Sequence, residues 1–299
     1  MMEISGILIL HKEEGMTSQS AVTRVRRLLG APKAGHTGTL DPMATGVLPI
    51  LVGRATVAGE YMLETDKHYR AELTLGLTTD TEDSTGTVLT RHEGSLPDAE
   101  AVRAAAESMM PGYVQIPPMY SALKRDGRKL YELAREGITV EREGRYISIH
   151  QLTVTPIGEG RYSLDVICSK GTYIRTLCAD IGKALGVGGV MSRLQRVEAA
   201  GYSLEVAHTL SELAEMSEEE RAAALLPVES LFLDRPTVVL PPFFARLAHS
   251  GAEIYQRKIG TTHPTGATVR LYDSDGFFSL GEVRDFPDGS AIKPIKKFR

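Results

Sequence analysis

One carboxylate stands where it could do chemistry, in a stretch crowded with glycine, threonine and proline. Asp41 lies within residues 35–50, which read GHTGTLDPMATGVLPI. Glycine permits backbone angles that are closed to other residues, and a residue before proline is biased away from helical geometry. A stiff turn should therefore set the direction of the Asp41 side chain. Such a turn suits a reacting group, although Asp-Pro in a glycine-rich loop can also be no more than a turn.

A second stretch has the residue types that bind nucleic acid. Basic side chains contact phosphates and aromatic rings stack on bases, so basic residues interleaved with tyrosines favour an RNA contact. The alternative is a solvated loop, because charged runs commonly face water. The stretch contains Lys124, Arg125, Arg128 and Lys129, interrupted by Asp126 and flanked by Tyr120 and Tyr131.

Length and composition limit the possible classes of protein. The chain has 299 residues, of which 42% are hydrophobic, and a formal net charge of −4. This length predicts one large domain and a smaller one. The negative sum argues only mildly against nucleic-acid binding, which depends on where the charge lies. No apolar run approaches the ~20 residues of a membrane span, and residues 1–10 read as a buried strand rather than a signal peptide. We expect a cytoplasmic protein.

The potential metal ligands are scattered. Cys168 and Cys178 have neither the paired spacing of a zinc site nor the number of a disulfide framework. The acidic residues of the stretch 79–86 do not have the spacing of a calcium-binding EF-hand loop. We therefore expect neither a metal nor a redox cofactor, and we interpret residues 79–86 as a structural loop.

Periodicity and capping residues predict a mixture of helices and strands. Residues 19–30 are amphipathic, with Thr17 or Ser18 as the cap and Gly30 as the stop signal. The pattern alone indicates an α+β protein. Further helices are predicted at residues 98–110, 172–186 and within 205–224, and strands at residues 69–75, 161–168, 267–272 and 276–283.

Four stretches resemble motifs of one family, the TruB-type tRNA pseudouridine synthases, which modify uridine 55 in the T loop of tRNA. They occur in the order that this family shows. The fourth stretch departs from the family pattern at Gly189 and Gln195, and Val57 stands where a basic residue is usual. The stretches are residues 35–49, residues 67–83, the complete Gly-Thr-Tyr-Ile-Arg run at 171–175, and residues 188–197.

The resemblance implies roles for the matching residues. Asp41 corresponds to the catalytic aspartate, and Arg175 corresponds to the arginine that pairs with it. A carboxylate that attacks carbon must be ionised, and a nearby guanidinium favours the charged form against the cost of burial. Tyr69, Tyr173 and Leu194 would contact the target base. Stacking on an aromatic ring, worth ~1–3 kcal/mol, replaces the neighbours that a flipped base loses.

The resemblance also implies an RNA surface and a domain plan. Residues 116–145 resemble an insertion that pinches the T arm, and we expect it to become ordered on RNA binding. The RNA-binding residues would be His36, Lys67, Lys124, Arg128, Lys129 and Arg196. We expect a catalytic domain with a large, mostly antiparallel sheet at residues 1–232. A β-rich, PUA-like RNA-binding domain would follow at residues 233–299. Its terminal cations, Lys293, Lys296, Lys297 and Arg299, are consistent with a contact to the acceptor stem.

The hypothesis is therefore a monomeric isomerase that converts uridine 55 of tRNA into pseudouridine by base flipping. Attack of Asp41 on C6, attack on C1′ and removal of a ribose proton all remain open. One rival is a tRNA-folding protein that binds the T loop without useful catalysis. A weaker rival is a hydrolase that uses Asp41 on a small ester, which would leave the basic and aromatic stretches unexplained.

Overall fold

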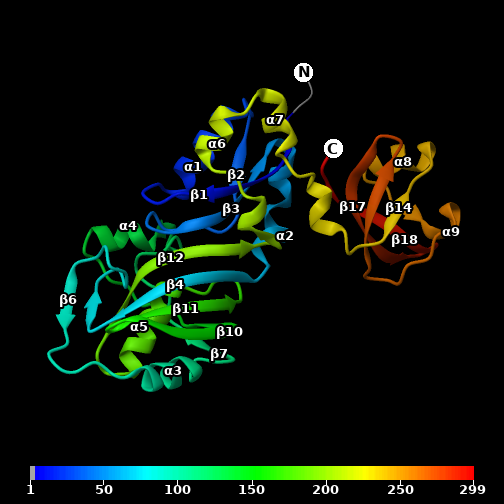
Figure 1. Cartoon of the computed structure of the whole chain (residues 1–299). Helices are drawn as coiled ribbons and strands as arrows, with labels where there is room; N and C mark the ends of the chain where they lie inside the picture. The colour runs from blue at the N-terminus through cyan, green and yellow to red at the C-terminus, as the bar shows by residue number, and fades with distance from the viewer. Residues whose placement is uncertain (1–3) are drawn as a thin grey trace.

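The computed structural model describes residues 4–299, which form a large sheet and a smaller C-terminal sheet (Figure 1). The predicted N-terminal strand is β1, Gly6–Lys12, and its expected first residues, Met1 to Glu3, lie outside the described residues. Within residues 4–299, no helix is both long enough and apolar enough to cross a membrane.

The large sheet has nine strands among the described residues, in the order β1-β3-β12-β4-β11-β10-β7, with β2 beside β3 and β13 beside β12. All neighbouring strands are antiparallel except β12 and β3. The predicted α+β class with a large, mostly antiparallel sheet is confirmed. The strands are β1 Gly6–Lys12, β2 Ala34–His36, β3 Thr45–Val52, β4 Lys67–Leu75, β7 Gly112–Gln115, β10 Arg145–Gly158, β11 Arg161–Cys168, β12 Gly189–Ala199 and β13 Tyr202–Ser203.

Helix bounds follow the capping residues. The side-chain oxygen of Thr17 accepts a hydrogen bond from the Ser20 amide at the start of α1, and Gly30 adopts φ +59° after its end. Thr209 and Ser217 cap α6 and α7 in the same way. A cap satisfies an amide that lacks a partner within the helix. The helices are α1 Ser18–Leu28, α2 Gly59–Leu63, α3 Ala99–Glu107, α4 Leu130–Arg135, α5 Ile174–Ala184, α6 Leu210–Glu215, α7 Glu218–Ala223, α8 Pro242–His249 and α9 Gln256–Ile259, and short 3-10 helices lie at Gly53–Ala58, Leu204–Val206 and Val228–Phe232.

Helix α5 begins two residues later than the sequence pattern predicts. Tyr173 is extended, with φ −100° and ψ 110°, so the first helical residue is Ile174. The side-chain amide of Gln115 accepts from the Tyr173 N–H at 2.8 Å and donates to the Tyr173 carbonyl oxygen at 3.1 Å. These bonds satisfy the backbone of Tyr173 without helical geometry. The contact joins β7 to the start of α5, which no local pattern reveals.

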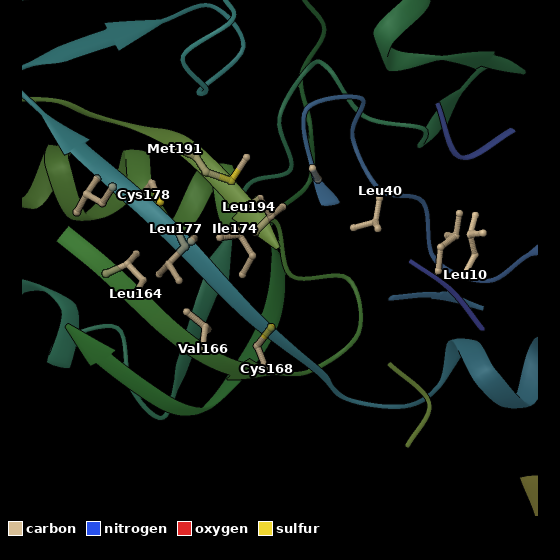
Figure 2. Close-up of a cluster of buried hydrophobic side chains, with 14 of the residues drawn as sticks. Leu10, Leu40, Leu164, Val166, Cys168, Ile174, Leu177, Cys178, Met191 and Leu194 are labelled. Carbon is tan, nitrogen blue, oxygen red and sulfur yellow. The ribbon is translucent and has the colours of Figure 1, made fainter. Parts of the chain in front are cut away.

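The main core lies where α5 packs against the large sheet (Figure 2). Ile174, Leu177 and Ile181 form one stripe of the helix and are at most 4% exposed. They belong to the same buried cluster as Leu164 on β11 and Leu194 on β12. Because this packing fixes α5, it also fixes Arg175, which lies in the first turn of the helix.

The C-terminal residues form a five-stranded sheet in the order β14-β16-β17-β18-β15. The predicted strands at residues 267–272 and 276–283 correspond to β16 and β17. Two small hairpins, β5 with β6 and β8 with β9, lie apart from both sheets. The bounds are β5 Leu77–Thr79, β6 Val88–Arg91, β8 Lys124–Arg125, β9 Arg128–Lys129, β14 Thr237–Val239, β15 Ile254–Tyr255, β16 Thr268–Asp273, β17 Gly276–Phe286 and β18 Gly289–Lys297.

Aromatic packing joins the C-terminal sheet to the rest of the chain. Phe232 is fully buried and lies 5.1 Å from the ring of Tyr61 and 5.6 Å from the ring of Phe298. Val57 is part of the same cluster, so the residue that replaces an expected basic side chain packs in this contact. Lys296 on β18 also pairs with Glu60 on α2 at 2.6 Å.

Candidate active site

Asp41 lies in the loop between β2 and β3, and residues near the start of the chain fix this loop. The Lys12 ammonium donates to the carbonyl oxygens of Ala44 at 2.6 Å and Pro42 at 3.2 Å. The Ser18 hydroxyl donates to the Leu40 carbonyl oxygen and accepts from the Leu40 amide. Lys12 is fully buried, and burial lowers its pKa to about 8, against the opposing effect of the Asp41 charge. The backbone on both sides of Asp41 is therefore held by buried side chains.

Arg196 on β12 supports the same loop from the opposite side. Its guanidinium donates to the carbonyl oxygens of Val47 at 2.8 Å and Gly38 at 2.9 Å, and its side chain is 1% exposed. Glycine is needed at position 46, where φ is +107° and a Cβ would lie 2.1 Å from the Arg196 carbonyl oxygen. We expected Arg196 to contact RNA, but the structure places it beneath the loop.

Arg175 and Asp41 form a two-point contact. Arg175 Nε donates to Asp41 Oδ2 at 2.8 Å and Nη2 donates to Oδ1 at 3.2 Å. The Arg175 side chain is 5% exposed, whereas that of Asp41 is 32% exposed. A guanidinium that binds both oxygens fixes the plane of the carboxylate. The pair thus presents an oriented carboxylate that solvent, and hence a substrate, can reach.

Two further backbone oxygens complete the environment of Arg175. Nη1 donates to the Thr81 carbonyl oxygen at 3.0 Å, and Nη2 donates to the Tyr120 carbonyl oxygen at 2.8 Å. The Asp83 carboxylate lies 3.9 Å from Arg175 Nε. We interpret the loop at residues 79–86 as structural, and in the structure it holds the guanidinium through Thr81 and Asp83. This contact was not predicted, although the similarity of residues 67–83 to a family motif was an available signal for it.

The three residues predicted to contact the base come from different elements. Tyr69 lies on β4, where its register partner on β12 is Arg196, and burial raises the pKa of its hydroxyl. Tyr173 is partly exposed at the start of α5, two residues before Arg175, and burial also raises its pKa. A raised pKa keeps both hydroxyls protonated near pH 7. Both rings are therefore uncharged, which suits stacking on a base. Leu194 is 8% exposed and belongs to the main core.

Two further predicted RNA-binding residues, Lys67 and His36, differ in their exposure. Lys67 is buried and its ammonium donates to the Leu63 carbonyl oxygen at 2.9 Å and also to that of Thr65, so it stabilises a turn of the chain. His36 lies on β2, partly exposed, with its Nδ1 atom buried and without a hydrogen-bond partner among residues 4–299. Burial and the charge of Arg196 lower the pKa of His36, which favours its neutral form.

The other predicted RNA-binding side chains lie on the β8–β9 hairpin. Lys124 and Arg128 are exposed, and Lys129 is partly exposed. Arg128 pairs with Glu136 at 2.5 Å, and Lys129 donates to the Tyr131 hydroxyl at 3.3 Å. Apart from the backbone pairing of Lys124 with Lys129, the Lys124 ammonium has neither a hydrogen bond nor an ion pair with the rest of residues 4–299. It is therefore the freest cation of this hairpin.

The terminal cations are already engaged within the chain. Lys293 pairs with Glu253 and Lys296 pairs with Glu60. Lys297 donates to the backbone of His249, and Arg299 pairs with Asp273. Arg257 and Lys258, in contrast, are exposed beside the Tyr255 ring. The exposed cations of this part of the chain that have no ion pair within the described residues thus lie on α8, at Arg246, and on α9.

A metal site is not evident in the described part of the chain. Among residues 4–299, no three His, Cys, Asp or Glu side chains are grouped so that they could hold a metal ion. Cys168 and Cys178 are free, buried thiols, and burial raises the pKa of each above its ordinary value. The polar groups around Asp41 are instead an arginine, a lysine and backbone carbonyl oxygens.

This loop and its arginine can be compared with known proteins. The family description "TruB family pseudouridylate synthase (N terminal domain)" matches residues 26–174, and "tRNA pseudouridylate synthase B C-terminal domain" matches residues 175–233. The tRNA pseudouridine synthase B of Alkaliphilus oremlandii is 44% identical over 285 residues, which cover 94% of this chain and 94% of that protein. Its namesake in Neisseria meningitidis serogroup B is 40% identical and covers 94% of this chain and 91% of that protein.

A solved structure supports the same relationship. The chain resembles a protein in the crystal structure of a Cbf5-Nop10-Gar1 complex, with a TM-score of 0.72 and 26% identity, covering 99% of this chain and 85% of that one. The chain belongs to the TruB family of pseudouridylate synthases. It is thus an isomerase, which replaces the N-glycosidic bond of a uridine by a carbon–carbon bond.

Proposed function

We propose that this chain isomerises uridine 55 in the T loop of tRNA, with Asp41 as the reacting carboxylate. The observation that carries the proposal is the contact between a buried guanidinium and a partly exposed carboxylate, with both oxygens of Asp41 bound by Arg175. The names of the relatives support tRNA as the substrate class. Because tRNA is the proposed substrate, we also propose a cytoplasmic location.

The reaction needs no co-reactant, since its product is an isomer of uridine. The enzyme flips the target base out of the folded T loop, which costs a few kcal/mol of unstacking. Asp41 starts the cleavage of the bond between N1 and C1′, and the freed uracil rotates in the site. C5 then joins C1′, C5 loses its proton and N1 gains one. Tyr69, Tyr173 and Leu194 would contact the base, and Arg175 would keep the carboxylate in one orientation.

The RNA surface that we propose includes the segment 116–145 and the C-terminal sheet. The segment would contact the T arm through Lys124, with Arg128 and Lys129 beside it, and would become ordered on binding. We propose that residues 233–299 form a PUA-like domain that contacts the acceptor stem, and that residues 1–232 form the catalytic domain. Exposed Arg257 and Lys258 suit this contact, since the terminal cations have partners within the chain. We propose that one monomer binds one tRNA.

The test is incubation with an unmodified tRNA transcript, followed by mapping of pseudouridine at single-nucleotide resolution. The wild-type chain should modify position 55. Asp41→Asn should form no pseudouridine but should bind tRNA as tightly as wild type, whereas Asp288→Asn, at an exposed position, should keep full activity. Pseudouridine at another position would reject the site assignment. Activity in Asp41→Asn would reject Asp41 as the reacting group.

A further inference from the structure

Glu82 lies in the loop that holds Arg175 and has an unusual backbone. Its φ angle is +63°, in the left-handed region that residues with a side chain seldom adopt. The Met191 amide donates to the Glu82 carbonyl oxygen at 3.1 Å, and the Ser84 amide donates to the Met191 carbonyl oxygen at 2.9 Å. These bonds attach the loop to β12. A strained conformation persists where the surrounding contacts impose it, and such positions cluster at functional sites.

The Glu82 side chain reaches the first turn of α5. Its Oε2 atom accepts a hydrogen bond of 2.5 Å from the hydroxyl of Thr176, which is buried and directly follows Arg175. The preceding residue, Thr81, accepts a hydrogen bond from the Arg175 guanidinium through its carbonyl oxygen. Two consecutive loop residues therefore hold two consecutive helix residues. A shift of Glu82 would move both the helix turn and the guanidinium.

Residues of this loop, of α5 and of the segment 116–145 line one cavity of about 520 Å³. Glu82 and Thr176 line it on one side, and Ile116 and Arg142 contribute from the segment. Arg142 Nη1 donates to the Pro117 carbonyl oxygen at 3.0 Å, while its Nε atom is buried without a hydrogen-bond partner within residues 4–299. No group within residues 4–299 donates a hydrogen bond to Glu82 Oε1. An incompletely bonded cation and an incompletely bonded carboxylate thus line one space.

We propose that Glu82 is a positioning residue for pseudouridine formation. Glu82 couples Arg142 of the segment 116–145 to Arg175, and this coupling acts through Thr176. When the segment moves toward α5, Arg142 can form a charge-assisted hydrogen bond with Glu82 Oε1. The carboxylate is then fixed at both oxygens, and its bond to Thr176 fixes the turn that presents Arg175 to Asp41. Engagement of the segment by RNA would in this way complete the catalytic geometry. The inference rests on the proposed role of Asp41 and Arg175.

The first test changes the hydroxyl that links Glu82 to α5. Thr176→Val keeps the shape of the side chain and removes the donor, whereas Thr176→Ser keeps the donor. With enzyme in excess over a tRNA transcript, Thr176→Val should form pseudouridine about tenfold more slowly at an unchanged Kd for tRNA. Thr176→Ser should stay within about twofold of wild type. Equal rates for wild type and Thr176→Val, or an equal loss in both variants, would reject the inference.

The second test measures the coupling between Glu82 and Arg142. Glu82→Gln retains an acceptor for Thr176 but removes the charge, and Arg142→Gln removes the proposed partner. Each single variant should slow the single-turnover rate several-fold, and the double variant should lose no more than the stronger single variant. Lys183→Gln, on α5 at the same cavity, should stay at the wild-type rate and combine multiplicatively with Glu82→Gln. This cycle also decides the matter if Thr176→Val does not fold.

The outcomes separate this inference from the proposed function. A wild-type chain without pseudouridine formation on tRNA would reject the proposed function itself. An active wild type with rate losses that multiply in the Glu82 and Arg142 double variant would reject only the coupling. A loss of rate that disappears when the enzyme concentration saturates the tRNA would also reject it, because a positioning residue changes the rate constant of the bound complex.

Discussion

Gly46 lies directly against the backbone of Arg196, at the parallel junction between β3 and β12. A Cβ at position 46 would come within 2.1 Å of the Arg196 carbonyl oxygen and 2.7 Å of its amide nitrogen. Neither atom can move without breaking the strand pairing that also positions the Arg196 guanidinium under the loop that carries Asp41. This close approach fixes the start of β3 against β12, and the loop that carries Asp41 ends at this point.

Gly46→Ala should therefore destabilise the fold by about 3 kcal/mol, at the upper end of ordinary single substitutions. Gly30→Ala is the matched control, since Gly30 also has positive φ, but a Cβ there would meet no atom within 4 Å. It should cost only ~1 kcal/mol, for the left-handed backbone alone. Urea unfolding measures both values. Equal losses in the two variants would show that the contact with Arg196 adds nothing.

Arg175→Lys should reduce pseudouridine formation about a hundredfold, the scale expected when a preorganised donor at the proposed reacting group is lost. The guanidinium donates to both oxygens of Asp41 and to two backbone carbonyl oxygens, and a single ammonium cannot reach all four acceptors. Single-turnover kinetics with a tRNA transcript measure the effect. Arg161→Lys, at a half-exposed ion pair with Glu72, should leave the rate unchanged. A comparable loss in that control would point to a general effect of the substitution.

Local patterns predicted the elements but not all of the contacts between them. The cap at Thr17 or Ser18, the strand at residues 69–75, which is part of β4, and the α+β class follow from periodicity and capping, which act within a few residues. Gln115 binds the backbone of Tyr173, 58 residues away, and this contact moves the start of α5. Nothing in the sequence around either residue indicates it.

The burial of charged side chains was the other feature that the sequence could not show. Lys67 and Arg196 were predicted to bind RNA, because basic residues in family motifs are read most simply as phosphate contacts. In the structure both use their donors on backbone carbonyl oxygens inside the protein. Lys12, which was not predicted to matter, does the same beneath Asp41. A lone lysine after the apolar run of β1 was the signal available for it.

Lys124→Gln should weaken tRNA binding in a salt-dependent way. Lys124 is exposed and has no acidic partner among the described residues, so it is free to neutralise a phosphate. Its loss should reduce the slope of log K against log salt by about 0.9. Lys67→Met should leave that slope unchanged and lower the melting temperature instead, because Lys67 stabilises an internal turn. Filter binding at several salt concentrations distinguishes the two variants. A change of slope in Lys67→Met would show that Lys67 contacts RNA.

Lys12 should make stability depend on pH above neutrality. Its pKa is about 8 in the folded chain, lowered from 10.5 chiefly by burial. Between these two values the unfolded chain binds a proton that the folded chain does not, so stability rises with pH. The free energy of unfolding of wild type relative to Lys12→Met should increase by up to ~1.4 kcal/mol per pH unit in this range. A difference that stays constant from pH 8 to 10.5 would contradict the lowered pKa.

Phe232→Ala should destabilise the chain by about 3–5 kcal/mol and loosen the C-terminal sheet. Phe232 is fully buried between Tyr61 on α2 and Phe298 near the end of the chain, so its removal leaves a cavity at the contact that joins the two sheets. Phe243→Ala is the matched control, because Phe243 is 58% exposed and should change stability by less than ~0.5 kcal/mol. Urea unfolding gives the two free energies, and limited proteolysis should show faster cleavage near residues 233–236 only in Phe232→Ala. Unchanged cleavage with a large loss of stability would mean that the sheets stay joined through the Lys296–Glu60 pair and the remaining aromatic rings.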